Sequence, residues 1–414
     1  MNRLICFILI LTVFSCYRVY ALSDTIASTQ DLKVYFSEIT DYDTVYINNG
    51  EYKVRDIFIK KHGLTVIGIN YPVLDAVNES GIITVEANNV TVKGITFRNT
   101  GISFVNDVCA IRVQNSEGVK IQNNVVENSF FAIYLSNTTN SYVDNNVING
   151  NSVTESFSGN GIHLWNCNNI LVSNNTIKRQ RDGIYLEFAK NSVILNNASS
   201  ENLRYGLHFM FSEGNKYVLN KFSMNGAGVA VMYTKRVAMI WNNFFDNWGE
   251  NAYGLLLKDI DNSTIYFNNF TKNTVGIYSE GSNKLTVQNN RFENNGWAMK
   301  ILGNCYDDVF SYNTFRNNVF DLATNSSRNN NKFEYNYWDK YNGYDIEKDG
   351  IGDVAYRPMN LFSLLIETSP EAIILLNSFM VNIIDFAEKV SPAFTPETLI
   401  DERPLMKDFI NAES

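Results

Sequence analysis

The 414-residue sequence predicts an all-β chain, a right-handed parallel β-helix solenoid, from three observations. An apolar alternating run that ends in Asn returns ten times, mostly 21 to 24 residues apart. Many of the strands begin with Gly, and the chain holds only 6 Pro. A period this short, rich in Val, Ile, Tyr and Asn, is typical of stacked coils. The runs end at Asn124, Asn146, Asn175, Asn197, Asn220, Asn243, Asn269, Asn290, Asn313 and Asn336.

The arithmetic of the period supports coils. Three strands of about 3 to 5 residues and three bends fill one repeat. Asn suits a fixed bend because it tolerates the left-handed conformation and can bond to the same amide one coil away. The alternative for so much Asn is a disordered polar tract. A hydrophobic content of 45% and an aromatic content of 13% argue against it.

Residues 1–21 have the features of a signal peptide: Arg3, an apolar stretch from Leu4 to Ser15, and a small-residue cleavage site that ends at Ala21. An alternative is an acylated Cys16, although the bulky Phe14 makes a poor lipoprotein box. Either interpretation predicts export to the periplasm.

Charge and cysteine content narrow the function classes. The net charge of −9 becomes about −11 without Arg3 and Arg18, which opposes binding to nucleic acid and favours cationic cargo. The mature chain keeps three widely spaced cysteines with no CxxC motif, Cys109, Cys167 and Cys305. This pattern indicates neither a disulfide framework nor a zinc finger, and buried apolar roles are expected.

The β-helix domain is expected over residues 22–358. Residues 28–39 predict a short amphipathic helix that caps the first coil. Coils then run without a linker from about Asp43 to Tyr337.

Residues 359–414 are expected to form a helical, amphipathic C-terminal tail. The segment from Leu361 to Val390 is apolar but too interrupted by polar residues for a membrane-spanning helix. Two alternatives stay open: a lid packed on the last coil, or peripheral docking on a membrane partner. Helical spacing places one set on a common face: Ile373, Leu376, Met380, Ile383, Ile384 and Ala387.

One strand per coil starts with Gly or Ala, and strand alternation assigns its side chains to inner and outer faces. The second residues after the start are expected to point outward: Arg112, Tyr134, His163, Tyr185, His208, Ala230, Leu256 and Tyr278. The fourth residues are expected on the same exposed face: Gln114, Ser136, Trp165, Glu187, Met210, Met232, Lys258 and Glu280.

A soft metal site is expected on this outward stripe. Coils lie ~4.8 Å apart, so Met210 and Met232 should be neighbours, with His208 beside them. Two thioethers and an imidazole suit transient Cu(I) binding. The alternative is an apolar face for docking of another protein, which would include His163, Trp165, Tyr185 and Glu187 as binding residues.

An acidic turn is a second candidate site. Asp345, Glu347, Asp349 and Asp353 alternate around Gly350, as at the start of a calcium loop. The match is incomplete because Glu347 takes the third position and Tyr356 takes the twelfth. A plain acidic turn is the alternative.

Several segments resemble the NosD family of nitrous oxide reductase maturation proteins. They are RYGLHFMFS from Arg204, NGAGVAVMY from Asn225, NWGENAYGLLLKDI from Asn247, NTVGIY from Asn273, YNYWDKYNGYDIEKDGIGDVAYRP from Tyr335, LFSLLIE from Leu361 and DERPLMK from Asp401. The resemblance implies a periplasmic β-helix subunit that partners an ABC-type permease and ATPase. It also implies a copper chaperone lipoprotein as donor and nitrous oxide reductase as the copper acceptor. Copper and these partners come from the resemblance.

Two other function classes use the same fold. A polysaccharide lyase or hydrolase needs paired acids, or basic residues beside carboxylates, on an exposed face. Glu187, Lys258 and Glu280 stand on separate coils, so the sequence predicts a protein that is not an enzyme. A passive surface adhesin would fit the repeats but gives no account of the apolar tail.

Overall fold

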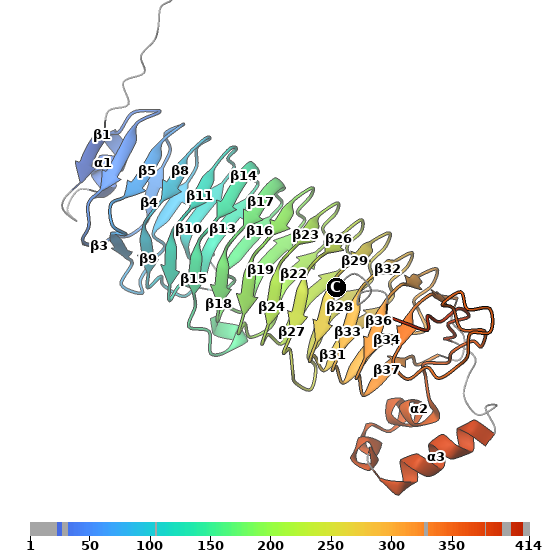
Figure 1. Ribbon diagram of the computed structural model, residues 1–414. Coiled ribbons are helices and arrows are strands. Elements are labelled where there is room, and N and C mark those ends of the chain that lie inside the picture. The colour runs from blue at the N-terminus through green and yellow to red at the C-terminus, as the bar shows by residue number, and fades with distance from the viewer. Residues whose placement is uncertain are drawn as a thin grey trace, which may run out of the picture.

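The chain folds into an elongated parallel β-helix with a helical appendage at its C-terminal end (Figure 1). The computed structural model describes residues 23–26, 32–103, 106–326, 330–376, 378–390 and 399–408. The predicted signal peptide and the acylation of Cys16 therefore lie outside the described residues.

Three parallel sheets run the length of the solenoid, and each coil contributes one short strand to each sheet. The 14-stranded sheet A contains β1 (Ser23–Ile26), β2 (Thr44–Ile47), β5 (Thr65–Gly68), β8 (Thr91–Lys93), β11 (Lys120–Gln122), β14 (Thr139–Asp144), β17 (Asn168–Ser173), β20 (Val193–Leu195), β23 (Lys216–Val218), β26 (Ala238–Ile240), β29 (Thr264–Tyr266), β32 (Thr286–Gln288), β35 (Val309–Ser311) and β38 (Lys332–Glu334).

The 13-stranded sheet B contains β3 (Glu51–Lys53), β6 (Val73–Asp75), β9 (Thr96–Arg98), β12 (Val125–Glu127), β15 (Val147–Asn149), β18 (Thr176–Lys178), β21 (Ala198–Ser200), β24 (Lys221–Ser223), β27 (Asn243–Phe245), β30 (Asn269–Thr271), β33 (Arg291–Glu293), β36 (Thr314–Arg316) and β39 (Tyr337–Trp338). A single-turn helix, η2 (Glu155–Phe157), interrupts the coil between β15 and sheet C.

The 12-stranded sheet C contains β4 (Ile57–Ile59), β7 (Ile83–Val85), β10 (Cys109–Gln114), β13 (Phe131–Ser136), β16 (Ile162–Trp165), β19 (Asp182–Glu187), β22 (Tyr205–Met210), β25 (Ala227–Met232), β28 (Tyr253–Lys258), β31 (Val275–Glu280), β34 (Trp297–Ile301) and β37 (Phe320–Ala323). Its strands are the predicted Gly-led strands. Gly is needed there because a Cβ on Gly206 would lie 2.6 Å from the carbonyl oxygen of Gly228 on the next coil.

A buried asparagine ladder ties successive coils together, as predicted. The left-handed residues, however, are not the ladder residues but those directly before them, such as Asn123, Asn145, Asn174 and Asn196. Each amide oxygen accepts from the backbone N–H and the side-chain NH₂ of the ladder Asn one coil before, at 2.8–3.1 Å. The rungs are Asn124, Asn146, Asn175, Asn197, Asn220, Asn242, Asn268, Asn290, Asn313 and Asn336. Every ladder amide thus satisfies buried backbone groups that water cannot reach.

Two rungs differ from the sequence prediction, which aligned Asn243 and Asn269. Trp241 and Phe267 occupy the corner position that an Asn holds in earlier coils, with φ of 57° each. The buried rung is therefore the first Asn after the aromatic residue, Asn242 or Asn268, and the second Asn points outward on sheet B.

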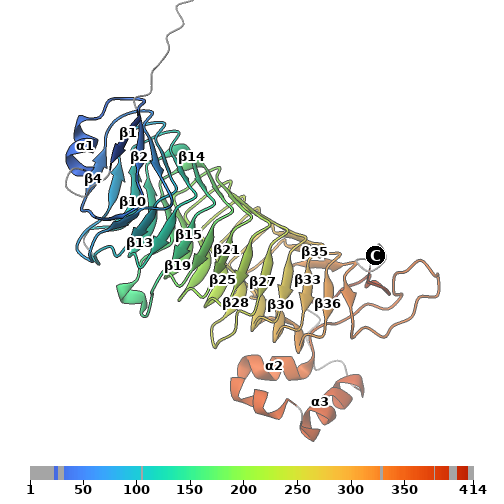
Figure 2. The same ribbon diagram turned by 60° about the vertical axis from the view of Figure 1, so that its left-hand side comes forward.

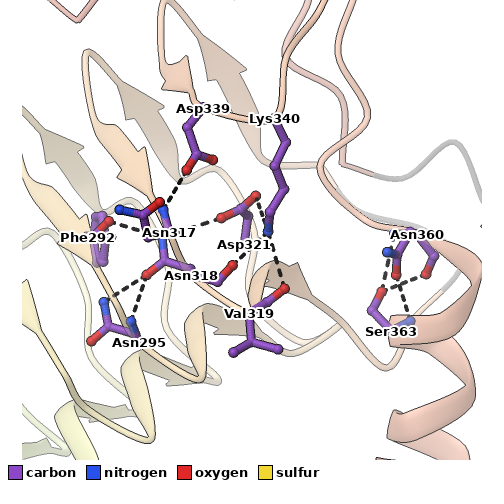
Figure 3. A network of polar contacts seen from close by, with 10 residues as sticks. All are labelled: Phe292, Asn295, Asn317, Asn318, Val319, Asp321, Asp339, Lys340, Asn360 and Ser363. Carbon is purple, nitrogen blue, oxygen red and sulfur yellow. Dashed lines mark hydrogen bonds and ion pairs between the residues drawn. The ribbon is translucent and has the colours of Figure 1, made fainter. Parts of the chain in front are cut away.

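A second buried ladder runs through Asn202, Asn225, Asn247, Asn273, Asn295 and Asn318. Figure 3 shows how it ends. The Asn318 amide donates to Asp321 at 3.4 Å, and Lys340 Nζ donates to the Asn318 carbonyl at 2.8 Å and pairs with Asp321 at 3.2 Å. The ion pair of Asp321 and Lys340 thus takes the place of a further ladder Asn at the end of the coils.

Both ends of the solenoid are covered. The helix α1 (Leu32–Glu38) lies within the predicted N-terminal cap and buries Leu32 and Phe36. At the other end, Asp401 accepts from Asn336 N, Asn336 Nδ2 and Trp338 Nε1, each at 3.0 Å. Asp401 is therefore the last rung of the first ladder. The predicted domain boundary after residue 358 put residues 399–408 in the tail, but they close the last coil of the β-helix.

The C-terminal helices pack beside sheet C (Figure 2). They are α2 (Leu361–Thr368), η3 (Pro370–Leu375) and α3 (Phe379–Val390). Asn360 caps α2 by accepting from Ser363 N at 2.8 Å, also visible in Figure 3. Phe362 and Ile366 are buried against Val275, Trp297 and Phe320, so the helices pack along the last three strands of sheet C and not on the last coil alone, as the lid alternative had it.

The outer side of the helical tail stays uncovered. Leu376 and Ile384 pack inward, whereas other residues of the predicted apolar face do not. The face is divided because η3 and α3 are separate helices. Ala387 lies among the residues whose side chains are not described. The exposed apolar residues are Ile373, Ile374, Phe379, Met380, Ile383 and Phe386. None of the helices that the structure describes has the length and apolar character to cross a membrane.

Candidate functional site

The outer face of sheet C holds the predicted stripe. Side chains of β22 that the alternation places inside, Leu207 and Phe209, are fully buried in the core. Outward positions pair in register from coil to coil, so that Tyr185 faces His208 and Glu187 faces Met210. The strand phase predicted from the sequence is confirmed.

The rings of the stripe form a continuous stack. Tyr134 lies 4.5 Å from His163, His163 lies 4.7 Å from Tyr185, and Tyr185 lies 4.7 Å from His208, measured between ring centroids. The stack ends at His208 because Ala230 occupies the same position on the next coil.

The expectation that both imidazoles stand exposed is wrong. His163 is 8% exposed and His208 is 4% exposed, because neighbouring rings cover their faces. Burial lowers the pKa of His163 to about 3, so this ring is neutral at physiological pH. Both of its nitrogens lack a hydrogen-bond partner among the described residues.

Met210 and Met232 are direct neighbours, as predicted. They pair in register on β22 and β25, and both are half-buried. The Tyr185 hydroxyl donates to Met210 Sδ at 3.5 Å. His208 stands two residues before Met210 on the same outer face, so the three predicted copper donors share one surface.

An ion pair between buried Asp182 and partly exposed Arg204, which sequence reasoning missed, lies beside His208. Arg204 Nε donates to Asp182 Oδ1 at 2.9 Å, and Arg204 Nη2 donates to Asp182 Oδ2 at 2.5 Å. His208 Nδ1 lies 3.4 Å from Asp182 Oδ2. Burial opposes the charge of Asp182, but hydrogen bonds from Arg204 and His208 outweigh it and bring the pKa of that carboxyl to about 2.

The other predicted binding residues flank the methionine pair on the earlier coils. Trp165 pairs in register with Glu187, which pairs with Met210. Trp165 is 36% exposed, in agreement with the prediction. On the later coils Lys258 lies 3.7 Å from Glu280, so these two charges partner each other.

A row of aromatic corners borders the methionine pair and was also missed. Phe188, Phe211 and Tyr233 directly follow Glu187, Met210 and Met232 in the chain. Their rings stack at 5.4 and 5.2 Å between centroids, with interplanar angles of 12° and 15°. All three are more than 40% exposed, and their φ values are 50–53°. Bulky residues in this left-handed region are uncommon.

The acidic turn is self-capped. Asp345 accepts from the backbone N–H of Gly350 at 2.9 Å, Asp353 accepts from that of Ile346 at 2.6 Å, and Asp349 accepts from that of Ile351 at 2.9 Å. Within the described ranges, no three His, Cys, Asp or Glu side chains gather as metal ligands. The structure thus does not bring Asp345, Glu347, Asp349 and Asp353 together, and calcium binding stays a prediction.

The three cysteines that the structure describes are free and buried, as expected. Burial raises the pKa of the Cys109 and Cys167 thiols to about 12. They are therefore protonated at neutral pH and poor metal ligands.

Sequence comparison finds two family models, each along part of the chain, and curated relatives along most of it. A model described as "Periplasmic copper-binding protein (NosD)" matches residues 148–346, and a model of unknown function, DUF1565, matches residues 53–221. A "Probable ABC transporter binding protein NosD" from Pseudomonas aeruginosa is 30% identical over 81% of this chain and 82% of its own length. The protein of the same description from Stutzerimonas stutzeri is 26% identical over 81% of this chain and 80% of its own length.

Solved structures share the architecture at low identity. A mannuronic acid specific polysaccharide family 6 lyase from human gut microbiota has a TM-score of 0.60 at 12% identity, covering 86% of this chain and 94% of that chain. A family 6 alginate lyase in complex with a trisaccharide has a TM-score of 0.59 at 15% identity, covering 76% of this chain and 85% of that chain. At these identities the likeness shows the fold alone.

Proposed function

Because the chain belongs to the NosD family, we propose that it is the periplasmic subunit of an ABC-type assembly that receives copper and passes it on for the catalytic centre of nitrous oxide reductase. The family description and the names of the relatives support the periplasm, copper and an ABC transporter. A copper chaperone lipoprotein as donor and nitrous oxide reductase as recipient extend this proposal.

The observation that carries the proposal is the in-register pair of Met210 and Met232 beside His208. Thioether and imidazole groups bind Cu(I) without a negative charge. The half-buried methionines are the more accessible donors, and the buried His208 ring beside them supplies a nitrogen. The set contains no thiolate, so it suits a site from which copper leaves again.

A triple variant tests the copper contact. His208→Ala with Met210→Leu and Met232→Leu should abolish Cu(I) binding while the far-ultraviolet circular dichroism is unchanged. In cells, nitrous oxide reductase should accumulate without its catalytic copper. Met224→Leu is the matched control because Met224 is an exposed methionine that precedes β25. Normal maturation by the triple variant would remove the basis for the copper contact.

The exposed side of the helical tail supports docking on the permease. Ile374 is 87% exposed and Phe379 is 76% exposed, and an apolar surface of this kind usually has a partner. The ATPase then joins through the permease on the cytoplasmic side, and the chain is membrane-associated only through its partners.

Surface substitutions test docking better than truncation. Deletion after Asn360 would also remove Asp401, which closes the last coil. Ile374→Glu with Phe379→Glu should instead leave the β-helix intact and abolish co-purification with the permease. Val153→Glu, at an exposed apolar residue elsewhere, is the control. Unchanged co-purification of the double variant with the permease would contradict the docking proposal.

We further propose that the chain is not an enzyme. Lys258 and Glu280 of the stripe pair with each other, which leaves them unsuited to acid–base work on a sugar. Turnover of alginate or another polysaccharide by the purified protein would favour the enzymatic alternative. An adhesin would show neither turnover nor co-purification with the permease.

A further inference from the structure

We infer that Asp182, held by Arg204, is a positioning residue that keeps the ring proton of His208 on Nδ1 and leaves Nε2 as the free ligand atom. That Nε2 binds a metal rests on the proposed function. The position of the proton does not, since it follows from the hydrogen bonds of the protein alone.

The first step is the geometry around Nδ1. Asp182 is the first residue of β19, and its side chain is fully buried. Its Oδ2 lies 3.4 Å from His208 Nδ1 on the next coil. An ionised carboxylate can only accept a hydrogen bond, so this contact is a hydrogen bond when His208 carries its ring proton on Nδ1.

The second step is the role of Arg204. A buried carboxylate without a cation would become protonated, or it would stabilise a doubly protonated imidazole. The two hydrogen bonds from Arg204 supply that cation and satisfy both carboxylate oxygens. Asp182 can therefore stay ionised and accept the hydrogen bond from His208 Nδ1.

The third step is the state of Nε2. This atom is buried and has no hydrogen-bond partner among the described residues. Buried polar atoms without partners are rare and require an explanation, such as a bound ion. The ring cannot turn freely, because Tyr185 stacks on it at 4.7 Å and Tyr205 contacts it at 4.8 Å. The lone pair of Nε2 thus has a fixed direction.

His163 is an internal comparison. It stands in the same ring stack two coils earlier, yet both of its nitrogens lack partners. Stacking alone therefore does not bring a carboxylate to an imidazole. Along this stack, only His208 has both a carboxylate and an arginine beside it. It is also the ring that has Ala230, and no further ring, at the same position of the next coil. A carboxylate behind a histidine is a common device for orienting a metal ligand, and its loss typically weakens metal binding by about 10- to 100-fold.

The test begins with the apo protein. Only three histidines are present in the chain, so ring ¹⁵N-labelled histidine gives a readable long-range ¹H–¹⁵N spectrum. His208, assigned by loss of its signals in His208→Ala, should show the Nδ1-protonated tautomer. Asp182→Asn should convert it to a mixture or to the Nε2-protonated form. Asp75→Asn is the control, because Asp75 forms a similar pair with Arg98 at 2.7 Å on early coils. An Nε2-protonated His208 in the unchanged protein would overturn the inference.

Cu(I) affinity, measured by competition with a chromogenic chelator, completes the test. Asp182→Asn should weaken binding about 10- to 100-fold, and Asp75→Asn should leave it unchanged. Arg204→Gln, which keeps the carboxylate, should also shift the tautomer and weaken binding. If His208→Ala loses affinity but Asp182→Asn does not, the positioning role is wrong. If the unchanged protein binds no Cu(I), the proposed function fails, and the tautomer spectrum alone then decides the role of Asp182.

Discussion

The corners after sheet C differ between the early and the middle coils. Asn115, Asn137 and Asn166 hold the corner in the early coils, with φ of 48–52°. In the middle coils, Phe188, Phe211 and Tyr233 adopt the same conformation, with φ of 50–53°. The backbone is the same in both regions, and only the side chain changes.

This difference separates residues that build the coil from residues that face a partner. Asn is the residue that suits a left-handed corner, whereas a bulky residue there costs roughly 1–2 kcal/mol. Ring stacking returns about 0.5–1.5 kcal/mol per pair. An aromatic residue in place of Asn at these corners gives no clear gain in stability. It does leave three exposed rings beside Met210 and Met232. We interpret the middle coils as the part of the solenoid that meets other molecules.

The largest expected effect is on the buried ladder. Asn242→Leu removes the amide that accepts from Asn220 and donates to Tyr217 O and Asn268 Oδ1. Several buried groups lose partners, each worth about 1–3 kcal/mol, so the free energy of unfolding should fall sharply. Asn243→Leu, at the outward Asn beside it, should change stability by less than ~0.5 kcal/mol. Denaturant titration compares the two, and equal effects would contradict the assignment of the rung to Asn242.

The last rung should show a local effect. Asp401→Ala removes the acceptor of three hydrogen bonds from Asn336 and Trp338. Hydrogen exchange should speed up at residues 331–338, while coils near Asn146 keep their protection. A uniform change along the solenoid, or none, would show that residues 399–408 do not close it.

A pH effect is expected from Asp308. Its Oδ2 is buried and has no hydrogen-bond partner in the part of the chain that the structure describes, and burial raises the pKa of this carboxyl to about 7. The folded protein therefore keeps a proton that the unfolded chain loses near its ordinary pKa of 3.8. The stability from this proton is complete below that value and is lost as pH rises through about 7.

Asp308→Asn tests this assignment, because an amide oxygen can still accept from Leu285 N but carries no charge. The variant should be more stable by about 1–3 kcal/mol at pH 8, and its stability should no longer fall between pH 4 and 7. Chemical denaturation across this pH range measures the effect. A parallel pH dependence in both proteins would assign the proton to another group.

The smallest effect on stability is expected at the aromatic corners. Phe211→Asn installs the residue of the early corners and should change the free energy of unfolding by less than about 1 kcal/mol. Binding of the molecules that meet the middle coils should nevertheless weaken. Asn137→Asp is a matched control at an early corner, and a loss of binding in the control alone would reverse the distinction between the two regions.

Much of the fold could be predicted from the sequence, because the coils depend on local patterns. The Asn repeat, the strand phase and the Met210–Met232 contact follow from the period and from alternation. The features that were missed depend on longer distances. Asp182 meets Arg204 only through the exact register of neighbouring coils, and Asp401 completes a ladder 65 residues after Asn336. The burial of His208 arises from ring stacking, which alternation of inner and outer faces does not describe.

The most direct test of the account is X-ray absorption spectroscopy of the protein loaded with one equivalent of Cu(I). We expect scattering from two thioether sulfurs and one imidazole nitrogen. The sulfur contribution should disappear in Met210→Leu with Met232→Leu and persist in Met224→Leu. A spectrum with only nitrogen and oxygen neighbours, or one that the double variant leaves unchanged, would contradict a copper site on the outer face of β22 and β25.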